Sequence, residues 1–170
     1  MKEITIDLST IHRPREICEL LKGIKYLTYC FRLKDGTVIK FGKAADSEWV
    51  YGSWGNRVYR QAGGISGWVE GELACTSAKK MQVLMQEYFP NVKKDDIIIS
   101  VFDHTAELEG AEKHVIEDTL LKDEDSRVQQ HITDKGCAPK LNIQKTKPGL
   151  RGGGARPDPN VLSAFFDFDE

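Results

Sequence analysis

The chain has 170 residues, of which 40% are hydrophobic and 29% are charged, as in an ordinary globular protein. This length suits one domain with one sizeable core. No apolar run approaches a membrane span, and the N-terminus alternates like a strand instead of carrying the apolar core of a signal peptide, which excludes a membrane partner. The expected location is cytoplasmic or nucleoid-associated, or the host cytoplasm for a viral protein.

The net charge of −2 is unevenly distributed along the chain. Residues 22–61 hold eight Lys or Arg against three acids, which gives +5 there and leaves −7 for the remainder. Such a stretch indicates a polyanion-binding surface or, equally, a solvated face. The four cysteines form no Cys-x-x-Cys pair and are expected to be isolated reduced thiols: Cys18, Cys30, Cys75 and Cys137.

Two short elements are expected first. Residues 3–8 alternate between polar and apolar and predict a strand. Residues 12–23 predict a helix, because Pro14 suits its first turn and Gly23 suits its end.

A β-hairpin is predicted over residues 25–43, where two runs rich in β-branched and aromatic residues flank the turn pair Asp35-Gly36. With a two-residue turn, paired positions sum to 71, so Tyr29 faces Gly42. Tyr29 and Lys40 then share one face as diagonal neighbours. The pattern indicates a phenol and an ammonium beside a bare glycine or, alternatively, a half-buried tyrosine and an exposed strand lysine.

The segment after the hairpin is aromatic but punctuated by glycine. Residues 45–56 predict a loop, whose Trp49 and Trp54 either stack on bases or fold over the core as a lid. Residues 57–61 predict a helical turn or two, stopped by Gly63-Gly64.

The rest of the chain alternates helix and strand. Residues 76–88 predict a helix, 97–102 a buried central strand and 108–122 a second helix. Residues 123–136 are polar and are interpreted as an excursion, after which 138–142 return to the domain. The tail divides into a flexible linker rich in Pro, Gly and basic residues (145–159) and an acidic, aromatic end (161–170).

The order of these pieces resembles the GIY-YIG nuclease family over residues 26–142. Leu27-Thr28-Tyr29 stands where the first signature ends in tyrosine, and Lys40-Phe41-Gly42 stands at the second. Lys40 replaces the second tyrosine, as in some restriction endonucleases of the family. An arginine on the next helix matches Arg57.

The second half of the resemblance lies in a glutamate helix. Glu112 and Glu117, five apart and followed by Leu-Leu-Lys, resemble the helix of the family's excision-repair nuclease, and Pro139-Lys-Leu-Asn142 resembles its closing Pro-x-x-Asn. The sequence also departs from the family. The gaps from Lys40 to Arg57 and from Glu117 to Pro139 are enlarged, and Gln61 stands where the family often has His or Tyr, a role left to Tyr59 or His104.

The resemblance implies an α/β fold, a small and mostly antiparallel sheet flanked by helices, and a Mg²⁺- or Mn²⁺-dependent DNA endonuclease of restriction-like, viral or repair type. Its domain would span residues 26–143, with an N-terminal extension (1–25) and a C-terminal tail (144–170). Its partners would be double-stranded DNA, a second copy in a homo-oligomer, and a protein bound by the tail.

The resemblance also implies roles. Tyr29 would take a proton from water, since a phenol, with a pKa of about 10 when free, becomes a better base beside the cations Lys40 and Lys43. Arg57 would bind phosphate oxygens, Glu117 would hold the metal ion, and Asn142 would position the glutamate helix or the hydrogen bonds of the site. The residues expected to contact nucleic acid are Trp49, Trp54, Arg60 and Gln61.

The catalytic residues are expected to converge on one open, basic concavity. Two alternatives are a catalytically inactive nucleic-acid-binding module of the same fold, and an interaction protein whose tail is a docking peptide. The tail could instead lie over the basic groove as an autoinhibitor.

Overall fold

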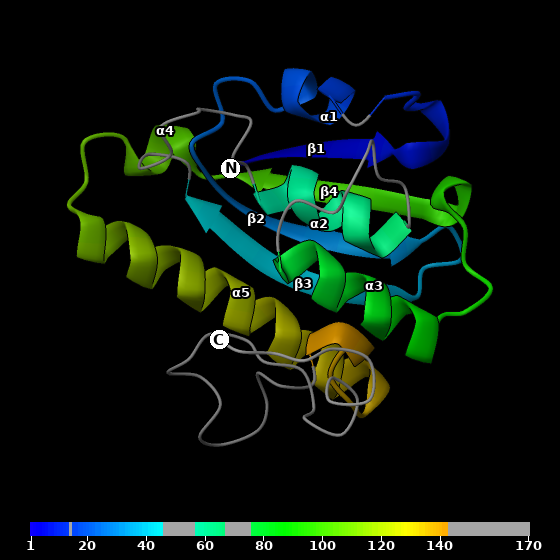
Figure 1. Cartoon of the computed structure of the whole chain (residues 1–170). Helices are drawn as coiled ribbons and strands as arrows, with labels where there is room; N and C mark the ends of the chain where they lie inside the picture. Colours follow the sequence, from blue (N-terminus) through cyan, green and yellow to red (C-terminus); the bar gives the residue numbers. More distant parts are fainter. Residues whose placement is uncertain (14, 46–56, 67–75, 143–170) are drawn as a thin grey trace.

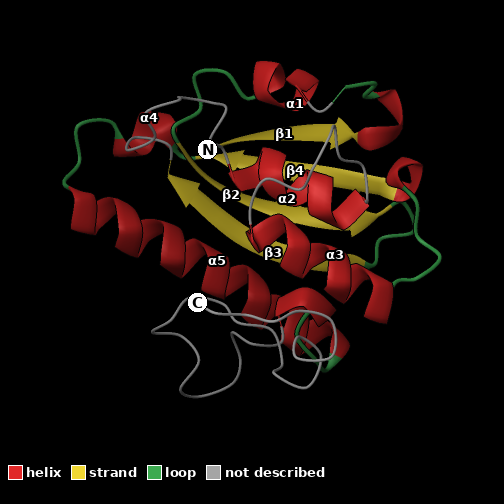
Figure 2. Cartoon of the chain, viewed as in Figure 1, coloured by secondary structure: helices red, strands yellow, loops and turns green. Residues whose placement is uncertain are grey.

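The computed structural model describes residues 1–13, 15–45, 57–66 and 76–142. It confirms an α/β fold with a four-stranded antiparallel sheet, in the order β1-β4-β2-β3 (Figures 1 and 2). The strands are β1 (Lys2–Asp7), β2 (Tyr26–Leu33), β3 (Val38–Ala45) and β4 (Ile97–Asp103). The helices are η1 (Leu8–Thr10), α1 (Arg15–Leu20), α2 (Arg57–Ser66), α3 (Thr76–Tyr88), η3 (Lys94–Asp96), α4 (Thr105–Leu108) and α5 (Lys113–Lys135).

Helices pack on both faces of the sheet. Successive residues of a strand point to opposite faces of the sheet, so consecutive residues of β2 pack against different layers of helices. Tyr29 and Phe31 belong to the main core with residues of α1, α2 and α3, whereas Cys30 packs with Val128 of α5. Figure 1 shows α2 and α3 in front of the sheet and α5 running alongside β3. The fold therefore has an α1–α3 face and an α5 face.

The hairpin register is confirmed where it matters for the site: Tyr29 pairs with Gly42. The turn itself differs from the prediction, because the register shifts after Phe31. Gly36 adopts a φ of +96°, its N–H donates to Leu33 O (2.9 Å), and Leu33 N donates to Thr37 O (2.8 Å). This pattern is a three-residue loop with a glycine bulge, which adds one residue to the expected two-residue turn.

Helix α2 continues through Gly63-Gly64, so the prediction that these glycines stop it is wrong. The buried residues of α2 recur at i, i+3, i+4 and i+7: Val58, Gln61, Ala62 and Ile65. Burial of this stripe against α1 and α3 outweighs the cost of glycine in a helix interior, which is about 1 kcal/mol per residue.

Helix α5 extends over residues 123–135, so the prediction of a polar excursion there is wrong. Its buried stripe recurs every four residues: Ile116, Leu120, Glu124 and Val128. One side of the helix is enough to dock it, which lets the other sides remain polar. Gly136 ends the helix with a φ of +84°, the left-handed conformation that glycine accepts readily.

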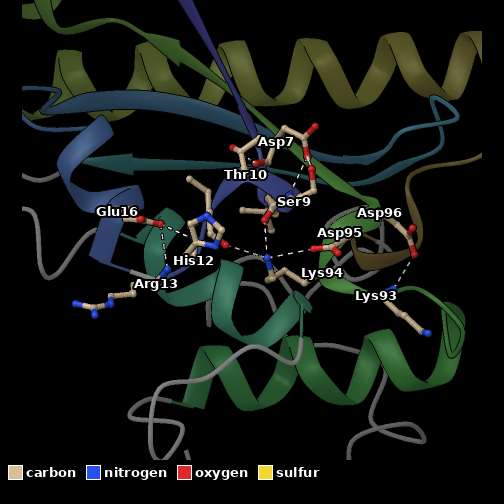
Figure 3. Close-up of polar contacts among 12 residues, drawn as sticks. Asp7, Ser9, Thr10, His12, Arg13, Glu16, Lys93, Lys94, Asp95 and Asp96 are labelled. Atoms are coloured by element: carbon tan, nitrogen blue, oxygen red, sulfur yellow. Dashed lines mark hydrogen bonds and ion pairs between the residues drawn. The ribbon is translucent and has the colours of Figure 1, made fainter.

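The N-terminal segment, expected as an extension, supplies β1 to the same sheet, where it pairs with β4. A lysine ties the turn after β1 to the turn before β4 (Figure 3). Lys94 Nζ donates to the carbonyl oxygens of Leu8 (2.7 Å), the first residue of η1, and Ile11 (2.9 Å), the residue that follows η1. Asp7 begins η1 by accepting from Ser9 N (2.9 Å). Leu8 O already accepts from Ile11 N (3.2 Å), so Lys94 adds a second hydrogen bond to it, whereas Ser9 N is a donor that a short helix leaves without an intrahelical partner.

The described cysteines take part in no disulfide, as expected: Cys18, Cys30 and Cys137. Burial raises the pKa of the Cys30 thiol to about 12, although Arg32 and Arg127 oppose the shift, so this thiol stays protonated. In the part of the chain that the structure describes, no helix has the length and apolar character needed to cross a membrane.

Candidate active site

Tyr29 and Lys40 meet inside the α1–α3 face of the sheet. Both are buried, with 1% and 4% of their surface exposed. Gln61 of α2 joins them, because its Oε1 accepts from Tyr29 OH (2.7 Å) and from Lys40 Nζ (2.8 Å). Lys40 Nζ also lies 3.7 Å from Met81 Sδ of α3. The alternative of an exposed strand lysine is therefore wrong. Gln61 is buried beside the pair, and its expected contact with nucleic acid stays a prediction.

The ring of Tyr29 lies so close to residue 42 that this position requires a glycine. A Cβ at Gly42 would lie 2.3 Å from both Cζ and the hydroxyl oxygen of Tyr29, closer than real Cβ atoms come. The ring cannot easily retreat, because it packs edge-on against Phe31 with ring centroids 5.4 Å apart. The bare glycine therefore creates the space that the tip of the phenol occupies.

Asn142 braces the strand that carries Lys40 and Gly42. Its Oδ1 accepts from Phe41 N (2.7 Å), and its Nδ2 donates to Phe41 O (2.9 Å). The side-chain amide thus pairs with the outer edge of β3 as a neighbouring strand would. Asn142 positions the hairpin, through contacts that the sequence did not predict.

Helix α2 brings Arg57 to the same region, since its backbone lies one turn before Gln61. The side chains of Arg57, Tyr59 and Arg60 are outside what the structure describes, as are Trp49 and Trp54 with their whole segment. Their expected contacts with phosphate and bases stay predictions.

Glu117 does not join the pair, and the expected convergence is wrong for this residue. Glu117 is exposed on α5, whose buried stripe includes Ile116 and packs on the α5 face of the sheet. Tyr29 points to the opposite face. The prediction that Lys43 joins the site is also wrong. Lys43 pairs with Thr28, so its side chain points to the face of the sheet opposite Tyr29.

Glu117, the residue predicted to hold the magnesium ion, lies apart from Tyr29 and Lys40. Glu117 is an exposed carboxylate across the sheet from Tyr29 and Lys40. Among the described residues, no group of three or more His, Cys, Asp or Glu side chains is arranged to hold a metal ion. A metal held by Glu117 would therefore act on a different face from the phenol.

A second polar cluster lies on the α5 face, and the sequence did not reveal it. Asp123 Oδ2 accepts from Thr28 Oγ1 (2.5 Å) and Arg127 Nε (3.0 Å), and it lies 3.3 Å from Nε2 of the buried His104. The guanidinium of Arg127 stacks on the ring of Phe102, 3.4 Å from its centroid. The i, i+4 spacing of Asp123 and Arg127 was a signal, but only for an extended α5.

Asp123 is held ionised by this cluster. Burial pushes its pKa up, but the hydrogen bonds from Thr28 and Arg127 and the charges of Arg127 and His104 outweigh it, so the pKa lies below its ordinary value of 3.8. Because folding lowers this pKa, ionised Asp123 stabilises the fold above that value, and the contribution is lost as the pH falls through the lower, folded-state pKa.

Asp123→Asn should therefore destabilise the protein by about 1–2 kcal/mol at pH 7, and the difference from wild type should shrink as the pH falls through the lowered pKa of Asp123. Urea unfolding at several pH values measures this. Asp118→Asn, at an exposed α5 carboxylate paired with Lys122, is the matched control and should cost less than about 0.5 kcal/mol. A loss at Asp123 that stays constant across the pH range would contradict the ionised state.

The chain matches no protein-family model, no curated protein and no solved structure.

Proposed function

We propose that the chain is a DNA endonuclease of the GIY-YIG type, with a phosphodiester-hydrolysing site built around Tyr29 and Lys40. The observation that supports this most is the convergence of the phenol and the ammonium on Gln61 over Gly42. Burying a lysine is costly, and a fold that merely needed packing would gain more from an apolar residue at this position. The buried pair therefore favours a chemical role.

The chemistry of the pair suits phosphate ester cleavage. Lys40 supplies a positive charge for the negative charge that develops on the phosphoryl oxygens, where preorganised cations are most effective. Arg57, at the start of α2, would add a planar fork for two phosphate oxygens. The oxygen of Tyr29 would orient the attacking water.

A plasmid-nicking assay with Mg²⁺ or Mn²⁺ tests the proposal. We expect wild type to nick, and Tyr29→Phe and Lys40→Met each to lower the rate by about 100-fold or more, as when a charge-stabilising group is removed from an active site. Tyr26→Phe and Lys122→Met are matched controls on the α5 side of the fold, and they should retain nicking. Full activity of both site variants would refute the role of the pair.

Glu117→Ala in the same assay locates the metal carboxylate. Loss of nicking would assign that carboxylate to the exposed α5 surface and require the substrate to reach round the edge of β3. Retained nicking would show that an acidic residue other than Glu117 holds the metal ion.

A second candidate is a nucleic-acid-binding module of the same fold that does not cut. The position of Glu117, on the opposite face from Tyr29, favours it. Such a module would bind a fluorescent DNA duplex with an affinity that falls steeply with salt, and would give no product with either metal ion. If wild type cleaves the DNA and Tyr29→Phe does not, the chain is an enzyme and not a binding module.

A further inference from the structure

The amide of Gln61 reveals which atom in the buried cluster carries a proton. The two polar ends of a glutamine side chain are a carbonyl oxygen, which accepts, and an NH₂ group, which donates. In the ammonium form that the proposed function requires of Lys40, its Nζ can only donate. The atom 2.8 Å from Lys40 Nζ must therefore be the carbonyl oxygen, and this fixes the orientation of the Gln61 amide.

That same oxygen lies 2.7 Å from the hydroxyl of Tyr29. A carbonyl oxygen has no proton to give, so the phenol must be the donor in this contact. A phenolate in its place would set an anionic oxygen against a carbonyl oxygen with no hydrogen between them, inside a buried site where such a repulsion is poorly screened. We infer that Gln61 holds Tyr29 in its neutral form as long as its carbonyl oxygen faces the pair.

This inference rests on the proposed function and deepens it, because it explains why Tyr29 orients the attacking water without deprotonating it. The single proton of the phenol is committed to Gln61, so Tyr29 can accept a hydrogen bond from a water molecule but cannot remove a proton from it. To become a base, Tyr29 must first release its proton to solvent. Gln61 must then turn its amide, so that Nε2 donates to the phenolate and Lys40 can donate to it as well. Gln61 is thus a positioning residue that separates a resting site from a basic one.

Tyrosine titration in the full chain tests this without any cleavage assay. With ¹³C at Cζ of all tyrosines, the signal of Tyr29 is the one missing from Tyr29→Phe. In Gln61→Met the carbonyl acceptor is gone and Lys40 can donate to the phenol oxygen, so we expect the titration midpoint of Tyr29 to fall by at least about one pH unit. In Gln61→Glu a carboxylate accepts from both donors and opposes the phenolate, so the midpoint should rise.

Gln130→Met is the control for replacing a glutamine by methionine. Gln130 lies on α5, away from Tyr29, and its side-chain Nε2 donates to Asp134 Oδ1 (2.9 Å). It should leave the midpoint of Tyr29 unchanged. Equal midpoints in wild type, Gln61→Met and Gln61→Glu would overturn the inference and leave Gln61 a packing residue. If Gln61→Met does not fold, the near-isosteric Gln61→Glu still decides by the direction of its shift. The titration does not depend on nicking, so a failed inference and a failed proposed function remain distinguishable.

Discussion

Gly42→Ala should lower the free energy of unfolding by about 3 kcal/mol or more, the upper end of the cost of overpacking a core. The added methyl would lie 2.3 Å from two atoms of the Tyr29 ring, and that ring is 1% exposed and braced by Phe31. Relief requires β3 to move away from β2 or Tyr29 to leave its place over the strand. Urea unfolding of the variant measures the loss.

A double-mutant cycle separates this clash from a general intolerance of β3. Tyr29→Leu removes the tip of the ring that the methyl would meet, so Gly42→Ala should cost at least about 1 kcal/mol less in that background. Gly36→Ala is the matched glycine control, since no atom lies within 4 Å of its added Cβ and only its positive φ of +96° is strained. It should cost about 1–2 kcal/mol. If the losses of unfolding free energy caused by Gly42→Ala and Tyr29→Leu are additive, the ring of Tyr29 is not the reason that position 42 requires a glycine.

The hairpin could be predicted from the sequence because its information is local. Alternation of side chains fixed the pairing of Tyr29 with Gly42, and it correctly set Lys40 on the same face as Tyr29. The same rule, applied to Lys43, would have excluded that residue from the site. The burial of Lys40 could not be predicted, because it depends on α2 and α3, which pack over the hairpin from later in the chain.

Helix α5 shows why the glutamate could not be placed. Its extent was underestimated, since the polar run after Lys122 has no apolar stripe apart from single residues spaced by four. Which side of the sheet a helix covers is a property of the connection that precedes it, and no pattern within α5 encodes this. Glu124 illustrates the limit: the sequence marks it as a surface carboxylate, yet it is 1% exposed.

Asn142→Ala is expected to have the second large effect, a loss of about 3 kcal/mol. The substitution deprives both backbone groups of Phe41 of their partners in a buried place, and each buried group left unsatisfied costs about 1–3 kcal/mol. Asn142→Asp keeps the acceptor for Phe41 N but turns a carboxyl oxygen toward Phe41 O, so it should also destabilise. Thermal and urea unfolding measure both, with the exposed Asn91→Ala as the control at less than about 0.5 kcal/mol.

Asn142 is expected to affect activity as well as stability, because it holds the strand that carries Lys40 and Gly42. Phe41 lies between Lys40 and Gly42, so loosening its backbone displaces the ammonium and the floor under the phenol together. In the proposed enzyme, nicking by Asn142→Ala should therefore fall even at temperatures where the variant remains folded, because misplacing a catalytic group by about 1 Å can cost about 100-fold in rate. Undiminished nicking in a folded but destabilised variant would mean that Asn142 supports the sheet without tuning the site.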